Sequence, residues 1–333
     1  IAEHFASSET NVYLAYPEVT TISDNVKKAP IQVVELTLPW KNTDQFSRGL
    51  TFLHEQEISC IYFTDQPYFK LQYALMRLKG VKQIIVHDHT PGDRPPVGGL
   101  KGALKKIKNV TPWLTANHVI CVSDHMRERN IANARIPAHK CTVVQNGIDP
   151  VKCKHRHSSD LIKELGVDES SLLVVSTGRA HPYKRFDFII ETANEFFKLS
   201  PESNVTFLLV GDGPAMSELR QLVHLLDLSE TVRLLGYRND VRDILCQADI
   251  AMHAALGEGF SLSIIEYMSA GLPVLVPDIA SVSQAITHNR TGLIYMRDDP
   301  KSAASYILEL ATNKERRHAM GIAAKTEANN NYR

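Results

Sequence analysis

The hydrophobic pattern of this chain alternates between short apolar runs and longer amphipathic segments. Short runs rich in Val, Ile and Leu predict buried strands, and apolar residues that recur every three to four positions predict helices. Strands and helices in regular succession form βαβ units, which build parallel sheets. In the first half the pattern predicts strands at residues 11–16, 31–36, 59–63, 83–87, 118–122 and 140–144, and helices at 44–56, 68–78, 100–115 and 124–130.

The second half repeats this alternation more regularly. Between the halves, residues 146–150 read Asn-Gly-Ile-Asp-Pro, which is turn-forming, and a polar stretch at 152–160 follows. We therefore predict an α/β protein of two Rossmann-like domains, residues 1–147 and 148–333, facing each other across a cleft. The second domain is predicted to have strands at 172–177, 205–210, 232–235, 250–254, 274–276 and 293–295.

Two segments of the first half interrupt the pattern. Residues 1–6 read as the end of a helix, so we expect an earlier strand and its loop to precede them. Residues 88–99 contain three prolines and three glycines, which predicts a long surface loop after the strand at 83–87.

Composition excludes several classes of protein. The 333 residues carry 37 basic and 37 acidic side chains, so nothing global indicates a nucleic acid partner. No apolar run approaches the ~18 residues that span a bilayer. The five cysteines are scattered without a Cys-x-x-Cys pair, which indicates neither a disulfide framework nor a zinc site and favours a reducing, cytoplasmic setting.

Residues 257–273 have the chemistry of a ligand site. A predicted strand leads into a glycine-bracketed loop that contains Glu258, and a short apolar helix with Glu266 in its opening turns follows. Loops at the carboxyl ends of parallel strands are where open α/β sheets bind ligands. The alternative is structural, because Ser263 and Glu266 fit a capping box in which Glu266 only holds a backbone N–H of its own helix.

The two glutamates are separated by seven residues, with Gly-Phe after the first and Ala-Gly-Leu-Pro-Val closing the segment. This pattern resembles the donor-site motif of retaining GT-B glycosyltransferases of family 4, whose members also carry Asn-Gly-Ile-Asp between their two domains. The resemblance implies metal-independent, retaining transfer of a sugar from a UDP- or GDP-sugar to a glycan, lipid-linked or other acceptor. It implies no cofactor beyond this co-substrate, and the sequence contains no Asp-x-Asp triplet of the kind that metal-dependent transferases use.

A leaving diphosphate requires cationic groups and helix N-termini aimed at it. Gly178 and Arg179 follow the first strand of the second domain, and Lys184 stands at the start of the next helix. The resemblance implies that Arg179 and Lys184 grip the diphosphate, one as a fork and the other as a point charge. The alternative is that Lys184 and its neighbour Arg185 are solvated residues at a helix start.

Two further turns of the second domain match the family. Gly211 and Gly213 belong to a Gly-x-Gly-Pro segment after the second strand, although a tight strand-to-helix turn explains them equally well. Tyr237 and Arg238 follow the third strand. At this position, members of the family contact the nucleotide base. Tyr237 is alternatively a surface aromatic residue.

The resemblance also assigns the groups around the sugar. Glu266 would accept hydrogen bonds from the ribose hydroxyls, and Glu258 with the backbone of Gly259, Phe260 and Ser261 would hold the transferred sugar. A carboxylate suits a sugar diol because it accepts two hydrogen bonds at once. The two glutamates are not expected to act as a glycosidase pair, since the leaving phosphate would take the acceptor proton.

In the first domain, His87 ends the predicted strand at 83–87 and matches the histidine that the family places beside the transferred sugar. His89 is a competitor two residues further on. The chain has 14 histidines, and one near a strand end is more often structural than catalytic. Only its position favours His87.

Residues 100–108 alternate Lys101, Lys105, Lys106 and Lys108 with Leu and Ala, and form a basic amphipathic segment. Family members with lipid-linked acceptors dock on anionic membranes through such a surface, so the segment predicts peripheral membrane contact. The alternative is a solvated helix whose apolar side packs on its own domain.

Two other functions stay open. One is another GT-B chemistry, such as a nucleotide-sugar epimerase or a phosphorylase. The second is a non-catalytic nucleotide-sugar-binding subunit that retains the fold. The chain also departs from the family at Gln284, where a Gly-Gly-x-x-Glu segment is common, and this argues against an acidic role there.

Overall fold

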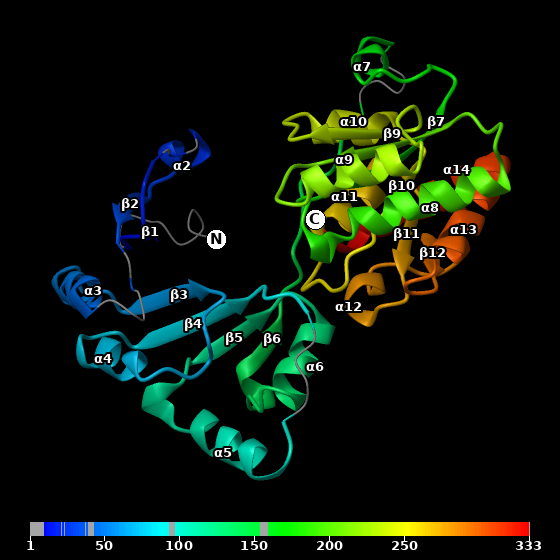
Figure 1. Ribbon diagram of the computed structural model, residues 1–333. Coiled ribbons are helices and arrows are strands. Elements are labelled where there is room, and N and C mark those ends of the chain that lie inside the picture. The colour runs from blue at the N-terminus through cyan, green and yellow to red at the C-terminus, as the bar shows by residue number, and fades with distance from the viewer. Residues whose placement is uncertain are drawn as a thin grey trace. The chain divides into compact units, whose positions relative to one another are not determined.

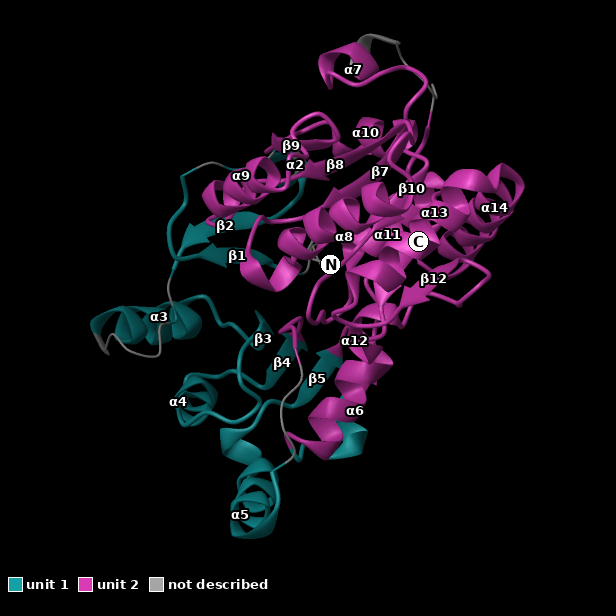
Figure 2. Cartoon of the chain, turned by 45° about the vertical axis from the view of Figure 1, so that its right-hand side comes forward, with its two compact units in different colours: residues 1–87, 97–120, 135–141 teal, residues 88–96, 121–134, 142–333 magenta. Residues whose placement is uncertain are grey.

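The computed structural model describes residues 10–20, 22, 24–36, 38, 43–92, 97–153 and 159–332. The opening residues 1–6 and parts of the loops at 88–99 and 152–160 lie outside these ranges. The chain divides into two compact units (Figure 2). Unit 1 comprises residues 1–87, 97–120 and 135–141, and unit 2 comprises residues 88–96, 121–134 and 142–333.

The predicted strands of the first half form two sheets rather than one (Figure 1). A parallel pair joins β1 (Tyr13–Tyr16) to β2 (Gln32–Glu35), with Tyr13 opposite Gln32. The other sheet has the order β3-β4-β5-β6. These strands are β3 (Cys60–Thr64), β4 (Gln83–Asp88), β5 (His118–Cys121) and β6 (Cys141–Val143).

Two of the four helices predicted in the first half are shorter than predicted. The helix expected at 68–78 begins only at Gln72, because Phe69 bridges to Thr115 and is held in an extended contact. The helix expected at 100–115 ends at Asn109, and Pro112 begins a separate 3-10 turn. The helical elements are α2 (Asp24–Lys28), α3 (Thr43–Glu55), α4 (Gln72–Leu78), α5 (Gly99–Asn109), η1 (Pro112–Leu114), α6 (Asp124–Ala132) and η2 (Ala138–Lys140).

Unit 2 contains a six-stranded parallel sheet with the order β12-β11-β10-β7-β8-β9. The chain starts in the middle at β7, adds β8 and β9 on one side, and then returns to build the other side. This is the doubly wound Rossmann arrangement that the sequence predicts. The strands are β7 (Leu172–Thr177), β8 (Val205–Val210), β9 (Val232–Gly236), β10 (Ile250–Met252), β11 (Val274–Pro277) and β12 (Gly292–Tyr295).

Helices cover this sheet on both faces. Every residue of β8 is buried, as expected for a central parallel strand. α8 packs against α9 and α13, and α11 packs against α10 and α14. The helices are α7 (Ser159–Glu164), η3 (Pro182–Lys184), α8 (Phe186–Leu199), α9 (Met216–Leu225), α10 (Val241–Gln247), α11 (Leu262–Ala270), α12 (Ala280–Ser283), α13 (Pro300–Thr312) and α14 (Lys314–Asn331).

The segment that follows the predicted domain boundary is attached to unit 2. The Ile148 amide donates to the Tyr332 carbonyl at 3.0 Å, and the Val151 amide donates to the Ser269 hydroxyl at 2.9 Å. The continuous part of unit 2 begins at residue 142. A boundary between residues 147 and 148 stays a prediction.

Cys153 and Cys246 form a disulfide, with their Cα atoms 5.3 Å apart. The expectation that no cysteines pair is therefore wrong for these two. Their separation of 93 residues in sequence gave no indication of the bond, because only the fold of unit 2 brings residue 153 to α10. A disulfide is not typical of a reducing compartment, and the cytoplasmic setting stays a prediction.

No helix in the described ranges is long and apolar enough to cross a membrane.

Candidate active site

The candidate site lies at the carboxyl ends of β7 and β10. These two strands are neighbours, yet the chain leaves them in opposite directions, toward β8 on one side and β11 on the other. Loops that diverge in this way leave a crevice between them, and such switch points are where doubly wound sheets bind ligands. The loop after β7 carries Arg179 and Lys184, and the loop after β10 carries Glu258.

The loop after β7 is fixed from two sides. Tyr267 of α11 is fully buried, and its hydroxyl accepts from the Thr177 amide at 2.6 Å and bonds the Thr177 hydroxyl at 2.9 Å. From the β8 side, a Cβ at Gly211 would lie 1.7 Å from the Gly178 carbonyl oxygen, so only glycine permits this approach. Sequence reasoning missed Tyr267, because nothing in a helical tyrosine indicates which strand its hydroxyl reaches.

Lys184 and Glu258 form a close ion pair across the switch point. Nζ of Lys184 lies 2.5 Å from Oε1 of Glu258, and the two side chains are only 13% and 11% exposed. This contact is consistent with the prediction that Lys184 and Glu258, which are 74 positions apart in sequence, belong to one site. Lys184 is not a solvated residue at a helix start, which was the structural alternative. Arg185 is half-buried and forms ion pairs with Asp187 and Asp298.

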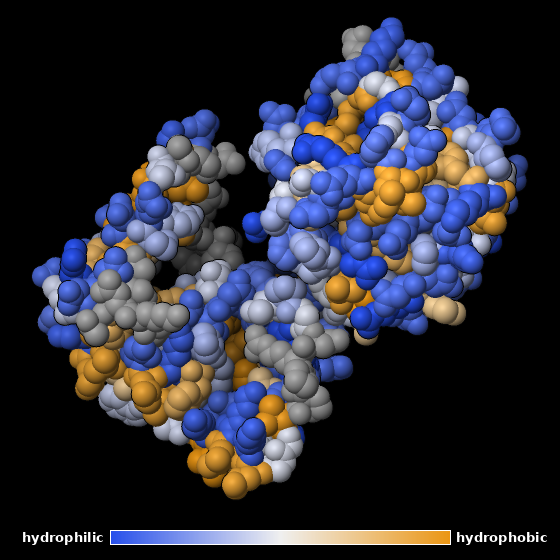
Figure 3. All heavy atoms as spheres, viewed as in Figure 1, coloured by the Kyte–Doolittle hydropathy of each residue, from blue (hydrophilic) through white to orange (hydrophobic). Residues whose placement is uncertain are grey.

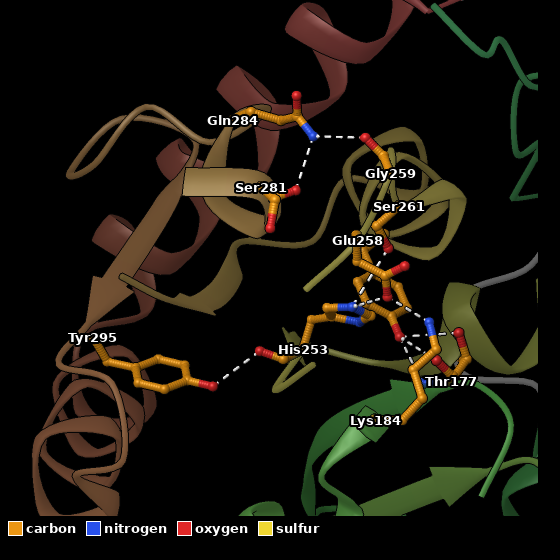
Figure 4. A network of polar contacts seen from close by, with 10 residues as sticks. Thr177, Lys184, His253, Glu258, Gly259, Ser261, Ser281, Gln284 and Tyr295 are labelled. Carbon is orange, nitrogen blue, oxygen red and sulfur yellow. Dashed lines mark hydrogen bonds and ion pairs between the residues drawn. The ribbon is translucent and has the colours of Figure 1, made fainter. Parts of the chain in front are cut away.

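A buried histidine completes this cluster (Figure 4). His253 follows β10, and its Nε2 lies 3.0 Å from Oε1 of Glu258 and 3.5 Å from the Ser261 hydroxyl. Its own position is fixed by the backbone, since its amide donates to the Leu275 carbonyl and its carbonyl accepts from Tyr295. The sequence analysis missed His253, because it stands in a strand-end run of apolar residues with no motif around it.

Burial and pairing set the charge states of the cluster. Burial lowers the pKa of His253 below its ordinary value, so the imidazole is neutral at pH 7 despite the neighbouring carboxylate. For Glu258, burial acts to raise the pKa, but the hydrogen bond from His253 and the charge of Lys184 outweigh it, and the pKa is lowered. The site therefore holds an ionised carboxylate between a neutral donor and a cation.

The loop of Gly259, Phe260 and Ser261 is held by other elements of unit 2. Ser123, the N-cap of α6, donates from its hydroxyl to the Gly259 carbonyl at 2.9 Å. A Cβ at Gly259 would lie 2.9 Å from both the His89 carbonyl oxygen and the sulfur of Met126, so a side chain has no room there. Phe260 is buried against Tyr332, with the ring centroids 5.5 Å apart.

The contacts of Gln284 explain why this chain has a glutamine where the family commonly has the glutamate of a Gly-Gly-x-x-Glu segment. Its amide nitrogen donates to the Gly259 carbonyl at 3.2 Å and to the Ser281 carbonyl at 2.8 Å. Both partners are acceptors, so the position requires a donor that a carboxylate does not supply. The glutamine therefore helps to hold the loop beside Glu258.

Glu266 does not form the capping box. α11 begins at Leu262 with Ser261 as its N-cap, and no side chain caps the helix, so Ser263 already lies inside it. Burial raises the pKa of Glu266, and the positive charge of Arg242 on α10 opposes that shift. Glu266 is half-buried, and its role at a ribose stays a prediction.

The remaining predicted donor residues differ in their surroundings. Arg179 is exposed and has no ion pair among the described residues. A Cβ at Gly213 would lie 2.3 Å from the Ala180 carbonyl oxygen, so this glycine permits close packing of two loops. Tyr237 is 80% exposed. Arg238 is engaged by Asp240 and Glu164, at 2.6 and 2.7 Å.

His87 belongs to unit 1, whereas the other predicted site residues belong to unit 2. It lies at the end of β4, as predicted, and is buried. Its Nδ1 is hydrogen-bonded to the hydroxyl of Tyr62 on β3. Burial raises the pKa of Tyr62, so the phenol keeps its proton. A role for His87 beside the sugar stays a prediction.

Among the described residues, no three His, Cys, Asp or Glu side chains are grouped as metal ligands.

Comparison with known families matches both halves of the chain. The family model described as Glycosyltransferase Family 4 matches residues 1–152, and the one described as Glycosyl transferases group 1 matches residues 171–313. Solved structures of similar fold include a glycosyltransferase from Rickettsia africae, with a TM-score of 0.79 at 16% identity over 97% of this chain and 86% of that one. WaaG, a glycosyltransferase involved in lipopolysaccharide biosynthesis, has a TM-score of 0.72 at 15% identity over 98% and 89%.

These matches define the class of protein as a GT-B α/β fold of two Rossmann-like domains. The chain belongs to the group 1 glycosyltransferases of this fold, and the resemblance seen in its sequence is confirmed.

Curated relatives show the range within this family. The N-acetyl-alpha-D-glucosaminyl L-malate synthase of Bacillus anthracis is 27% identical over 59% of this chain and 51% of its own length. The UDP-Gal:alpha-D-GlcNAc-diphosphoundecaprenol alpha-1,3-galactosyltransferase of Escherichia coli is 27% identical over 63% and 57%. The matched region thus spans little more than half of either relative.

The contacts of Gln284 predict that Gln284→Glu destabilises unit 2. The carboxylate would face two carbonyl oxygens and lose both hydrogen bonds, which costs roughly 1–3 kcal/mol and lowers the thermal midpoint by several degrees. Gln221→Glu makes the same chemical change at an exposed position of α9 and is expected to leave stability within about 0.5 kcal/mol of wild type. Equal midpoints for the two variants in thermal unfolding would contradict this assignment.

Proposed function

We propose that this protein transfers a sugar from a nucleoside diphosphate sugar to an acceptor, with retention of configuration and without a metal ion. The observation that carries the proposal is the contact of Lys184 with Glu258 at the switch point of a nucleotide-binding fold. A cation for the diphosphate and a carboxylate for the sugar lie side by side there. The donor's leaving group and its sugar are likewise adjacent, so one site serves both.

Arg179 and Lys184 are proposed to bind the diphosphate. The exposed guanidinium of Arg179 offers forked donors to one phosphate, and the ammonium of Lys184 offers three N–H groups to the other. The charge that develops on the leaving diphosphate is neutralised by these side chains, which is the basis for proposing metal-independent transfer.

The carboxylates are proposed to bind the hydroxyl groups. Glu258, with the backbone of the loop at 259–261, accepts from the transferred sugar, and Glu266 accepts from the ribose. The leaving phosphate takes the acceptor proton on the same face of the sugar, which gives retention. His87 is proposed to lie beside the transferred sugar.

The donor is a UDP- or GDP-sugar in this proposal, and the comparisons favour UDP. HepE of Anabaena, whose structure was solved with UDP, has a TM-score of 0.71 at 20% identity over 91% of this chain and 82% of that one. The name of the E. coli relative specifies UDP-Gal. The names of relatives include an N-acetyl-alpha-D-glucosaminyl L-malate synthase, a galactosyltransferase that acts on a diphosphoundecaprenol-linked sugar, and a phosphatidylinositol N-acetylglucosaminyltransferase subunit. A small molecule, a glycan or a lipid-linked acceptor therefore fits the family.

We further propose that unit 1 contacts an anionic membrane through α5 and its neighbours. Helix α5 buries Gly102 and Asn109, while Leu100, Leu104 and Ile107 are 78%, 50% and 64% exposed. Its apolar stripe is thus turned away from unit 1, and the alternative of a stripe packed on its own domain does not describe this helix. The stripe is flanked by exposed lysines, which are Lys101, Lys106 and Lys108.

The apolar surface continues beyond α5. Leu71, Leu75 and Leu78 on and before α4 are 66%, 45% and 70% exposed, and Trp113 of η1 is 55% exposed. Figure 3 shows hydrophobic residues at the surface where α4 and α5 lie. Exposed aliphatic groups with a tryptophan and flanking lysines complement an anionic bilayer surface.

Nucleotide titration tests the proposed donor site. UDP is expected to bind equally well with magnesium and with a chelator, and more tightly than ADP, with GDP as the second candidate. Lys184→Ala is expected to weaken this binding by roughly 10- to 100-fold, the value of one or two charge-assisted hydrogen bonds. Lys198→Ala is the matched control, because Lys198 is 60% exposed on α8. Absence of binding, or equal affinity in the two variants, would contradict the site.

The stereochemistry of transfer is read from the first-formed product. Retention predicts that the anomeric configuration of the donor is preserved in the product, as seen in the proton coupling of the anomeric signal by NMR. The opposite anomer would show an inverting mechanism. Nucleotide binding without any transfer, across glycan and lipid-linked acceptors, would favour the non-catalytic subunit.

Vesicle sedimentation tests the membrane surface. The protein is expected to bind vesicles that contain phosphatidylglycerol and not pure phosphatidylcholine, with weaker binding at high salt. The double change Leu104→Ser with Ile107→Ser is expected to lower the partition constant at least tenfold, since each buried aliphatic side chain contributes about 1.5–3 kcal/mol. Leu199→Ser with Leu225→Ser removes two exposed leucines from unit 2 as a control. No preference for anionic vesicles, or equal loss in both variants, would reject the surface.

A further inference from the structure

His253 holds the carboxylate on which the sugar site depends. Its ring is only 2% exposed, and Nε2 lies 3.0 Å from Oε1 of Glu258. The backbone that carries this ring is fixed, because the His253 amide donates to the Leu275 carbonyl at 2.8 Å and the Tyr295 hydroxyl donates to the His253 carbonyl at 3.0 Å. The His253 side of its contact with Glu258 is therefore anchored to the end of β10.

The direction of this hydrogen bond follows from charge. An ionised carboxylate only accepts hydrogen bonds, so the ring proton of the neutral imidazole lies on Nε2 and is donated to Glu258. The Ser261 hydroxyl lies 3.5 Å from the same nitrogen. His253 thus anchors Glu258 without adding a charge to the site.

Lys184 is the other partner of the same oxygen atom, at 2.5 Å. In the proposed function Lys184 must also serve the diphosphate. When a diphosphate binds, the ammonium shares its three N–H groups between phosphate oxygens and Glu258, and its hold on the carboxylate weakens. A buried carboxylate that loses its cation needs another hydrogen bond to stay ionised and in place.

We propose that His253 is a positioning residue that keeps Glu258 ionised and oriented while Lys184 turns toward the donor diphosphate. This inference rests on the proposed function for its consequence in catalysis, and on the structure alone for the contact. Oε2 of Glu258 accepts no hydrogen bond from the described part of the chain. With Oε1 held by His253, Oε2 is the atom that accepts from a hydroxyl of the transferred sugar.

Three variants separate positioning from simple packing. His253→Gln retains an N–H group at a reach close to that of Nε2, His253→Asn has the same amide one methylene shorter, and His253→Leu has no donor. In wild type, Gln and Leu variants, UDP affinity is expected to agree within about threefold. The turnover number of transfer is expected to fall roughly 100-fold in the Leu variant, with a smaller change in KM, and to recover to within about tenfold of wild type in the Gln variant.

A second readout does not depend on turnover. In protein labelled with ¹³C at glutamate carboxyl groups, loss of the donor is expected to raise the pH at which Glu258 titrates, since the bond from His253 stabilises the ionised form. In the described part of the chain, the titratable groups that contact this carboxylate are Lys184 from η3 and His253 from the end of β10, and Lys184 is unchanged in every variant. Glu258→Gln assigns the signal.

The outcomes distinguish the two proposals. A raised titration point in the Leu variant of a protein that shows no transfer would leave the positioning role intact and reject the transferase. Wild-type turnover and an unchanged titration point in the Leu variant would overturn the positioning role. If the Leu variant does not fold, the comparison of the Gln and Asn variants tests the positioning role. The turnover number of the Gln variant is expected to exceed that of the Asn variant at least tenfold, and equal turnover numbers would overturn the inference.

Discussion

The candidate site depends on one buried carboxylate. Glu258 lies among side chains that exclude water. An isolated carboxylate there would have a raised pKa and would take up a proton. Lys184 and His253 prevent this by meeting the same carboxylate oxygen from two different strand ends. Their contacts join the loop after β7 to the loop after β10, so the electrostatics of the carboxylate and the geometry of the switch point are one constraint.

Other buried polar groups support the same arrangement. Tyr267 fixes the end of β7 from α11. Gln284, the C-cap of α12, and Ser123, the N-cap of α6, fix the loop at Gly259. None of these side chains needs to touch a ligand. Each holds a backbone segment whose amides and carbonyls would otherwise be free to rotate, and a site built on loops requires such support to keep its distances.

The exposed apolar surface of unit 1 departs from the usual packing of an amphipathic helix. An amphipathic helix in a globular domain turns its apolar stripe toward the core. Helix α5 buries Gly102 and Asn109 and leaves its leucines outside. The membrane contact proposed for this surface would place the exposed leucines against lipid and the flanking lysines against anionic headgroups.

The local features of this protein were predictable from its amino-acid sequence. Periodicity predicted the alternating strands and helices, since burial on both faces of a parallel sheet leaves continuous apolar runs. It also placed Arg179, Lys184 and Glu258 at strand ends, because turn residues mark where strands stop. The family resemblance added the fold and the expected donor chemistry.

Which distant groups come into contact was not predictable from the sequence and required the folded structure. Sequence spacing indicates neither that His253 reaches Glu258 nor that Cys153 pairs with Cys246, because such contacts depend on how the strands are ordered in the sheet. The capping box at Ser263 was equally consistent with the sequence, and the start of α11 at Leu262 excluded it. Likewise, periodicity showed that α5 has an apolar side but not which way it faces, since that depends on the packing of the whole unit.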